Sequence, residues 1–497
     1  MLSDIEISRQ TMPRPLSAVA EELGIPNEAL LAYGHTKAKV DVKRLEPKEE
    51  GRIVLVTAIS PTPAGEGKTT TTIGLADALR SLGHSSMVCL REPSMGPVFG
   101  MKGGATGGGY AQVIPMEEIN LHFTGDLHAI GAANNLIAAC LDNHMYWNNE
   151  PKLDLGRILW RRVVDMNDRS LRNIEVMRGF KQDRYVYETG FDITVASEIM
   201  AVFCLAKNRD DLKQRLGEII VAYTVDGEAF RVSDLGIEGS LAVLLDQAID
   251  PNLVQTLEGT PAFIHGGPFA NIAHGCNSLI ATKTAAQLVD IVVTEAGFGA
   301  DLGAEKFLHL KAPQAGIWPS AAVVVATIRA LKHHGGAVDL KSSNPDAVRR
   351  GLPNLLRHLQ IMAEFGLPTV VALNHFATDT EEELEVVADA CAERGIRLAH
   401  SRVFAEGSVG GQDLANKVLE AMAEESEPKR LYSIQNSIEE KLQVLVNKVY
   451  GGRNVVFSDE ARQQAEEISA LGYGNLPVCV AKTPNSFTDD PKLLGVP

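Results

Sequence analysis

Short runs of β-branched and apolar residues recur along the chain, and each run ends in a glycine- or proline-rich loop that a helical pattern follows. Continuous apolar runs that alternate with helices are typical of a parallel sheet covered by helices on both faces. The pattern therefore predicts an α/β fold with a doubly wound, mainly parallel sheet. The clearest candidate strands are Ile53–Ile59, Met87–Leu90, Ile291–Ala296, Val323–Ile328, Thr369–Leu373 and Ile396–His400.

A ligand is expected in the segments that follow these runs, because open parallel sheets bind ligands beyond the carboxyl ends of their strands. The first two runs lead into SPTPAGEGKTTTT and REPSMGPVFGMKGGATGGGY, and two later runs lead into GFGADLGAEKF and NHFATDTEEE. In the last of these segments, Thr380 and Glu383 have the spacing of a capping box that starts a helix.

The same reading gives a predicted division into domains. Residues 1–365 are expected to form a main domain with an inserted subdomain at about 148–240, and residues 366–430 a second α/β domain. Residues 431–497 are more polar. They predict a small C-terminal domain with helices around Ser437–Tyr450 and Asp459–Leu471.

The segment after the first run has the composition of a phosphate-binding loop. Gly65 and Gly67 let backbone amides turn towards phosphate oxygens, and the N-terminus of the next helix adds partial positive charge. Lys68 would reach the β- and γ-phosphates of ATP, and the Thr69 hydroxyl would ligate Mg²⁺. The strict GxxxxGK[ST] pattern has glycine where this chain has Thr62, so a plain glycine-rich turn with a surface lysine is the alternative. The residues of this predicted phosphate-binding loop, which the family resemblance given below assigns to ATP, are Thr62, Pro63, Ala64, Gly65, Glu66, Gly67, Lys68 and Thr69.

This loop makes the expected fold P-loop NTPase-like, with smaller accessory α/β domains. Arg91 follows the second run, where its planar guanidinium would suit a phosphate or a carboxylate. We therefore predict Lys68 and Arg91 as the catalytic cations. An ordinary ion pair with the neighbouring Glu92 is the alternative for Arg91.

Two further features lie beyond the ends of predicted strands. Gly100–Tyr110 contains six glycines in eleven residues, a density that is costly in chain entropy. It indicates that the backbone either approaches a ligand closely, with Lys102 adding charge there, or makes a tight crossing. A flexible loop is an equal alternative. Phe376 and Phe404 could form a flat slot for a planar ring, although each could also be a core residue.

Composition and charge narrow the possible functions. The 497 residues, of which 45% are hydrophobic and 22% charged, suit two to four globular domains. A net charge of −16 provides no general field that would attract nucleic acid or an anionic membrane. The six cysteines contain no CxxC pair, and neither a signal peptide nor a membrane-spanning stretch is recognisable. A cytoplasmic location is expected.

Two other kinds of site are weak or excluded. His122, Asp126 and His128 are metal-ligand types, but their spacing matches no helical ligand pair, so a metal site is not expected. The segment beginning HGG at His265 resembles an oxyanion loop of lipases. The chain has no GxSxG nucleophile elbow, which excludes the hydrolase interpretation.

Taken in order, the motifs resemble those of formate–tetrahydrofolate ligases over nearly the whole chain, from about Gly51 to Gly495. The segments that carry the resemblance are PTPAGEGKTTTT, GMKGGATGGGY, FTGDLHAI, RVVDMNDR, FDITVASEIMA, NLVQTLEGTPAFIHGGPFANIAHGCNS, TEAGFGADLGAEKF and VATIRALKHHGG. The resemblance implies that ATP, formate and tetrahydrofolate are converted to ADP, phosphate and 10-formyltetrahydrofolate through formyl phosphate.

The resemblance also implies roles for individual residues. Arg91 would hold formate and then formyl phosphate with Glu92 beside it, and Phe376 would stack on the folate pteridine. Phe404 stands where the family usually has tryptophan, and Thr106 stands where it usually has alanine. Mg²⁺ would accompany ATP. A monovalent cation (K⁺ or NH₄⁺) and a homotetramer are further implications of the resemblance alone.

Family members normally continue past DDPKLLG, so the resemblance implies a chain that is short at its C-terminus. This departure and Phe404 leave two alternatives beside the ligase. One is a P-loop ATPase that acts as a switch or binding protein. The other is a catalytically weak relic of the ligase.

Overall fold

A large, mostly parallel sheet forms the centre of the computed structural model, which describes residues 2–100 and 104–496. The strand order along the sheet is β1-β2-β14-β15-β4-β16-β3-β17-β18-β19, and β6, itself paired with β5, also pairs with β14. The bounds are β1 Leu30–Ala32, β2 Ala38–Val40, β3 Arg52–Ala58, β4 Ser86–Leu90, β5 Gly107–Gly108, β6 Ala111–Ile114, β14 Asn252–Thr256, β15 Pro261–Ile264, β16 Ile291–Glu295, β17 Pro319–Ala326, β18 Thr369–Asn374 and β19 Arg397–Ser401.

The six predicted strands are confirmed, and they are neighbours in space. They correspond to β4, β16, β3, β17, β18 and β19, and every pairing from β15 through β19 is parallel. The antiparallel part of the sheet, from β1 to β15 with β6, was not predicted. Its strands are two to five residues long, which is too short to stand out as apolar runs.

Helices cover both faces of this sheet, as the continuous apolar runs predict. Along β3, Val54 and Val56 pack in one core with α3 (Lys68–Ser81) and α17 (Gln412–Met422). Leu55 packs in the opposite core with α13 (Ile328–His334), α14 (Pro345–Glu364) and α15 (Glu381–Ala392). α11 (Leu279–Leu288) belongs to a third core that contains Ile53. The doubly covered, mixed α/β architecture is therefore as expected.

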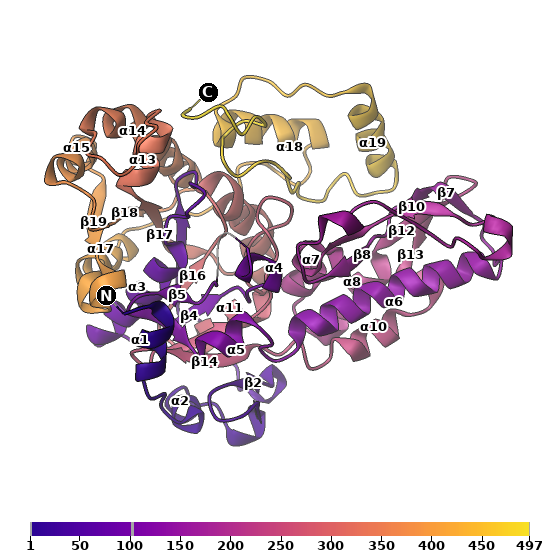
Figure 1. The fold of residues 1–497 in the computed structure, drawn as a ribbon, viewed down its shortest axis with the longest axis horizontal. Coiled ribbons are helices and arrows are strands. Elements are labelled where there is room, and N and C mark those ends of the chain that lie inside the picture. The colour runs from indigo at the N-terminus through magenta and orange to yellow at the C-terminus, as the bar shows by residue number, and fades with distance from the viewer. Residues whose placement is uncertain (1, 101–103, 497) are drawn as a thin grey trace.

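An accessory unit between β6 and β14 has a hydrophobic core of its own, which runs from Leu127 to Ile249 and also includes Ile280. It projects from one side of the main body (Figure 1). Its elements are α6 Asp126–Tyr146, β7 Leu153–Ile158, β8 Arg162–Val164, β9 Ile174–Val176, β10 Tyr187–Thr189, β11 Phe191–Ile193, α7 Glu198–Leu205, α8 Arg209–Glu218, β12 Ile220–Thr224, β13 Ala229–Arg231, α9 Val232–Leu235 and α10 Glu238–Leu244.

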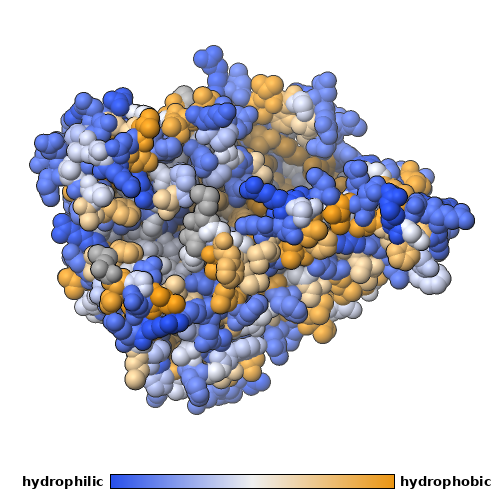
Figure 2. Space-filling model, in the orientation of Figure 1, coloured by the Kyte–Doolittle hydropathy of each residue, from blue (hydrophilic) through white to orange (hydrophobic). Residues whose placement is uncertain are grey.

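The C-terminal part contains both of the helices predicted for it. α18 spans Ile438–Leu445 and continues as a π-helical turn over Val446–Tyr450, and α19 spans Asp459–Ala470. Tyr432 and Phe487 enter the core that contains α14, so this part packs on the main body. On the face drawn in Figure 2, hydrophilic residues dominate the outline, and hydrophobic ones gather where the C-terminal part meets the body.

The remaining helices are short and connect these layers. They are α1 Asp4–Gln10, α2 Leu16–Glu22, α4 Met95–Val98, α5 Met116–Asn120, α12 Ala312–Ala315 and α16 Val403–Glu406. No helix of the described ranges is both long and apolar enough to cross a membrane. The segment 366–430 contributes β18 and β19 to the main sheet. The division into domains stays a prediction.

Candidate functional site

The candidate site lies where β4, β16, β3, β17 and β18 end, because these parallel strands deliver their carboxyl ends to one edge of the sheet. The predicted phosphate loop joins the end of β3 to the first residue of α3. Gly65 and Gly67 both have φ of +76°, in the left-handed region that favours glycine. A Cβ atom at Gly67 would also lie only 2.4 Å from the Asn374 amide nitrogen. The strand, loop and helix that the sequence predicted are therefore present.

Glu66 supports this loop from the inside. One oxygen of its buried carboxylate accepts hydrogen bonds from the backbone N–H (2.7 Å) and the hydroxyl (2.8 Å) of Thr62. The other oxygen accepts one from the Thr327 hydroxyl. Thr62 thus uses both donors to brace the loop at the position where the strict motif has glycine. Pro63 and Ala64 lie exposed on the outer turn.

Lys68, Thr69 and Arg91 converge on the carboxylate of Glu295, the last residue of β16. The Thr69 hydroxyl donates to Glu295 Oε2 at 2.7 Å, and Arg91 Nη2 lies 3.3 Å from Oε1. Burial lowers the pKa of the Lys68 ammonium, and the Glu295 and Glu66 carboxylates oppose that shift. Sequence reasoning quoted TEAGFGADLGAEKF but did not single out Glu295. A carboxylate at the end of an apolar run was the signal that could have found it.

Arg91 keeps hydrogen-bonding capacity for a ligand. Apart from Glu295, its described contact is a long bond of 3.4 Å from Nη1 to the Pro268 carbonyl. Its buried Nε has no hydrogen-bond partner among the described residues. An arginine held at one corner can still present N–H groups to a carboxylate or phosphate. The alternative of an ordinary Arg91–Glu92 ion pair is not what the structure contains, because the partner of Arg91 is Glu295.

Glu92 lies on the side of Arg91 that faces the accessory unit. Its backbone N–H donates to the Gly266 carbonyl at 2.7 Å. Burial, together with the nearby carboxylates of Asp126 and Asp165, raises the pKa of Glu92 well above its usual value, and Lys39 opposes the shift. The buried Asp126 forms a 2.8 Å ion pair with Lys39.

Phe376 and Phe404 follow the neighbouring strands β18 and β19. The Phe376 backbone N–H donates to Asp379 at 2.8 Å, and the Arg329 guanidinium carbon lies 5.0 Å from the centre of the Phe376 ring. Phe404, in α16, is 41% exposed. The His375 N–H donates to the Ser401 carbonyl at 3.0 Å and joins the two strand ends. Both aromatic residues therefore lie at the ligand edge of the sheet.

The glycine-rich segment forms a tight crossing against Phe404. The Tyr110 N–H donates to the Phe404 carbonyl at 2.9 Å. A Cβ atom at Gly109 would lie 2.0 Å from that carbonyl oxygen, and one at Gly108 would lie 3.0 Å from the Phe404 ring. Glycine is required where two backbones approach so closely. The buried Thr106 accepts a bond from the Asn120 amide, and Lys102 lies outside the described residues.

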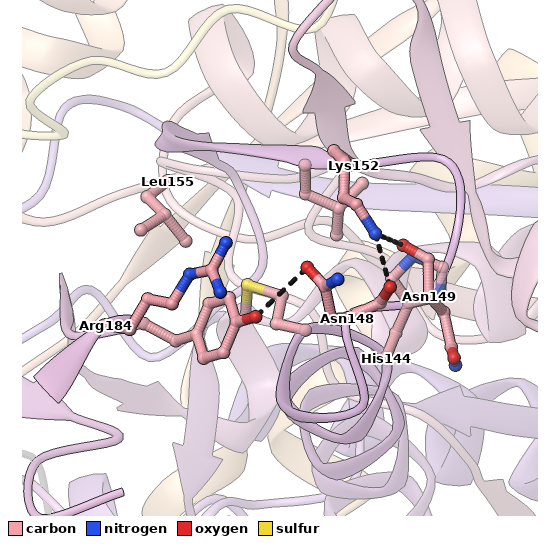
Figure 3. Close-up of a pocket in the computed structure, with 9 residues that line it drawn as sticks. His144, Asn148, Asn149, Lys152, Leu155 and Arg184 are labelled. Carbon is pink, nitrogen blue, oxygen red and sulfur yellow. Dashed lines mark hydrogen bonds between the residues drawn. The ribbon is translucent and has the colours of Figure 1, made fainter. Parts of the chain in front are cut away.

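The remaining groups considered from the sequence, the possible metal ligands and the segment at His265, do not form part of this site. Within the described ranges, no three His, Cys, Asp or Glu side chains gather into a metal-binding group. His265 bonds to the Ser278 hydroxyl and the Ala248 carbonyl, and burial lowers its pKa to about 4. Figure 3 shows a separate pocket at the end of α6, where Lys152 turns to the backbone oxygens of Asn148 and Asn149. None of the predicted site residues lines that pocket.

Comparison with known proteins confirms the resemblance over the whole length. The sequence profile of the family described as formate--tetrahydrofolate ligase matches residues 2–497. Formate--tetrahydrofolate ligase from Staphylococcus carnosus (strain TM300) is 56% identical over 499 residues, which cover 100% of this chain and 90% of that protein. The protein of the same name from Granulibacter bethesdensis (strain ATCC BAA-1260 / CGDNIH1) is 55% identical over 502 residues, which cover 100% of this chain and 88% of that protein. Since this similarity runs through every segment that borders the site, the chain belongs to the formate–tetrahydrofolate ligase family.

Proposed function

We propose that this protein joins formate to tetrahydrofolate at the expense of ATP and releases 10-formyltetrahydrofolate, ADP and phosphate. Its membership of the family, with more than half of the residues identical to two ligases, supports the overall reaction. The observation that supports this site is the convergence of Lys68, Thr69 and Arg91 on one carboxylate, Glu295. Two cations and a phosphate loop at one edge are what transfer of a phosphoryl group to a carboxylate requires.

The proposed chemistry has two displacements. A formate oxygen attacks the γ-phosphorus of ATP, the bond from that phosphorus to the β,γ-bridging oxygen breaks, and ADP leaves, which gives formyl phosphate. The N10 amine of tetrahydrofolate then attacks the formyl carbon, the bond from carbon to the phosphate oxygen breaks, and phosphate departs. The proton of the amine passes to the departing phosphate or to water. Lys68 would stabilise negative charge on the transferring phosphoryl group, and Arg91 would orient formate and hold formyl phosphate.

The loop from Thr62 to Thr69 would bind the ATP phosphates in the manner of P-loop NTPases. Its two left-handed glycines and the N-terminus of α3 favour an anion there. The Thr69 hydroxyl and the Glu295 carboxylate, 2.7 Å apart, are oxygen donors of the kind that Mg²⁺ takes beside nucleotide phosphates. The residues present therefore fit Mg²⁺, which would be held through Thr69 and would neutralise charge on the β- and γ-phosphates.

The finer family properties also belong to this proposal. The buried Glu92 carboxyl has one oxygen with no hydrogen-bond partner among the described residues, and it lies against Asp126. The monovalent cation, K⁺ or NH₄⁺, is proposed from membership of the family alone. We also propose that the protein is a homotetramer and that it is located in the cytoplasm. Phe376 and Phe404 would enclose the pteridine ring of the folate.

One experiment separates the ligase from its alternatives. Purified protein is incubated with ATP, Mg²⁺, K⁺, formate and tetrahydrofolate, and the mixture is acidified to convert the product to methenyltetrahydrofolate, whose absorbance is measured. A signal that requires all three substrates is expected. ATP hydrolysis without formate or folate, coupled to a binding partner, would favour the switch, and ATP binding without folate binding would favour the relic. The full-length similarity to two ligases favours the first outcome.

A further inference from the structure

Three hydrogen bonds join the phosphate loop to the elements that follow β17 and β18. Arg329, in α13, donates from Nη2 to the Gly65 carbonyl at 2.8 Å. The Asn374 side-chain amide, at the end of β18, donates to the Glu66 carbonyl at 3.2 Å. Thr327, the N-cap of α13, donates its hydroxyl to the Glu66 carboxylate. Two successive carbonyl groups of the loop are thus held from outside the loop.

The same two elements also carry the candidate folate contact. Phe376 comes two residues after Asn374, and its backbone N–H is fixed by Asp379 at 2.8 Å. The Arg329 guanidinium carbon lies 5.0 Å from the centre of the Phe376 ring, which is within the range of a cation–π contact. Arg329 therefore donates a hydrogen bond to the phosphate loop and makes a cation–π contact with the Phe376 ring.

A purely structural role does not account for all of this geometry. The Arg329 Nε is buried and has no hydrogen-bond partner among the described residues. Its carbonyl partner, Gly65, is in a left-handed turn with no neighbouring atoms within 4 Å of a Cβ built there. A purely structural arginine is expected to link two rigid elements. Arg329 instead links the exposed turn that is proposed to bind phosphates with the partly buried ring of Phe376.

We propose that Arg329 is a positioning residue that couples nucleotide binding in the loop from Thr62 to Thr69 to folate binding at Phe376. The proposal rests on the proposed function, which assigns these two ligands to these two places. A bound nucleotide fixes the Gly65 carbonyl, and this carbonyl fixes the guanidinium over the ring. Tetrahydrofolate then meets a ring that is already ordered, so its binding loses less conformational entropy. Coupling between two ligands is reciprocal, and folate therefore strengthens nucleotide binding by the same factor.

Arginine is required for this role because one planar group makes both contacts. Lysine carries a point charge on a flexible stem, and it can reach the carbonyl or lie over the ring, but it cannot do both in a fixed geometry. Glutamine can donate to the Gly65 carbonyl but has no charge for the ring. The two substitutions therefore separate the hydrogen bond from the cation–π contact.

The test measures binding and needs no turnover. Isothermal titration calorimetry under anaerobic conditions gives the Kd of tetrahydrofolate with and without Mg²⁺ and a non-hydrolysable ATP analogue, and formate is omitted. The full-length protein is compared with Arg329→Gln, Arg329→Lys and the control Arg349→Gln, whose arginine is 61% exposed and pairs with Asp346 on α14. Thermal unfolding is recorded for each variant.

For the unaltered protein we expect the nucleotide analogue to lower the Kd of tetrahydrofolate about fivefold to tenfold. We call the Kd of tetrahydrofolate without the analogue, divided by the Kd with it, the coupling ratio. This ratio should fall below about twofold in Arg329→Gln, reach about twofold to threefold in Arg329→Lys, and stay unchanged in Arg349→Gln. A merely structural defect would weaken each ligand alone and leave the ratio unchanged. An unchanged ratio in Arg329→Gln, or no coupling in the unaltered protein, would overturn the inference. Failure of the unaltered protein to bind either ligand would instead overturn the proposed function.

Discussion

The hydroxyl of Thr69 donates a 2.7 Å hydrogen bond to the carboxylate of Glu295. The two residues lie 226 positions apart in the chain, and they meet because β3 and β16 are parallel neighbours whose carboxyl ends share one edge. The second carboxylate oxygen of Glu295 lies 3.3 Å from Arg91, beyond the neighbouring strand β4. One nearly buried anion thus joins the phosphate loop to the arginine that is proposed to hold formate.

We predict that Glu295→Gln lowers kcat about 10- to 100-fold. The amide can still accept from Thr69, but it removes the charge that orients Arg91 and favours the charged form of Lys68. A lost charge-assisted hydrogen bond costs about 1.5–3 kcal/mol, which corresponds to this range of rates. Because Arg91 loses a competing carboxylate, KM for formate is expected to stay constant or fall. Steady-state kinetics against formate measures both parameters.

The matched control for this change is Glu117→Gln, which alters an exposed ion pair with Arg9. Its kinetics should match those of the unaltered protein. A Glu295→Gln enzyme with unchanged kcat, or one whose only change is a higher KM for formate, would contradict the role given to Glu295.

We expect Lys68→Ala to lower kcat roughly 10²- to 10³-fold, the usual effect of removing one preorganised charge from a site of developing negative charge. Lys68 begins α3 directly after the left-handed Gly67, so its ammonium is held at the phosphate loop. Turnover is measured with the acid-conversion assay, and Lys417→Ala, on the surface of α17, serves as the control. Near-normal turnover of Lys68→Ala would remove this residue from the proposed machinery.

Substitution of Arg91 should separate the two substrates. Arg91→Gln is expected to lower formate-dependent release of ADP by about 100-fold or more, while the Kd of the ATP analogue changes less than about threefold. The reason is that Arg91 follows the end of β4 and contacts Glu295, and it has no described hydrogen bond to the phosphate loop itself. ADP release and calorimetric nucleotide binding are measured side by side. An equal loss of both would indicate a role in ATP binding or in folding.

The sequence predicts the parallel part of this fold well because each central strand is buried on both faces. All six residues from Ile53 to Ala58 are buried, so their apolar character marks the strand directly. The short antiparallel strands β1 and β2 form no apolar run of this length. β1 spans three residues, two of which are exposed, and β2 is equally short. Their pairing depends on contacts between distant segments, which a local pattern cannot contain.

The residues of the candidate site also fall into a group that the sequence predicts and a group that it does not. Gly65, Gly67 and Lys68 could be identified because their spacing along the chain is itself the motif. Glu295 and Arg329 were not identified, because their contacts with the phosphate loop are made with Thr69 and Gly65, each more than 200 residues away in the chain. The surroundings of Glu92 could not be predicted either. The Asp126 carboxylate contributes to the raised pKa of Glu92, and no sequence motif connects these two residues.

Phe404→Trp is predicted to strengthen tetrahydrofolate binding about threefold to tenfold. The indole has a larger face than the benzyl ring, and one stacked aromatic pair contributes about 0.5–1.5 kcal/mol. The ring is 41% exposed, so one side has room to grow, while Gly108 closes the other side. The Kd is measured by calorimetry, with Phe180→Trp in the accessory unit as a matched control. Unchanged affinity in Phe404→Trp would place the folate ring elsewhere.

The last prediction concerns stability and pH. Asp77 lies in α3 and is 2% exposed, and the Thr256 hydroxyl donates to it at 2.7 Å. Burial raises its pKa to about 7, and the hydrogen bond from Thr256 only partly opposes this shift. The folded state therefore binds this proton more tightly than the unfolded chain, whose aspartate has a pKa of about 3.9. The contribution of Asp77 to stability is present below pH 4 and is lost as the pH rises towards 7.

Asp77→Asn keeps the shape of the protonated side chain and removes this dependence. We expect the variant to be more stable than the unaltered protein at pH 8, by up to about 4 kcal/mol for a shift of about three pKa units. The advantage should become small near pH 4.5. Urea unfolding at both pH values measures the difference, and Asp346→Asn, at a position with 79% exposure, should show none at either. An equal effect of Asp77→Asn at the two pH values would mean that Asp77 is ionised in the folded protein throughout this range.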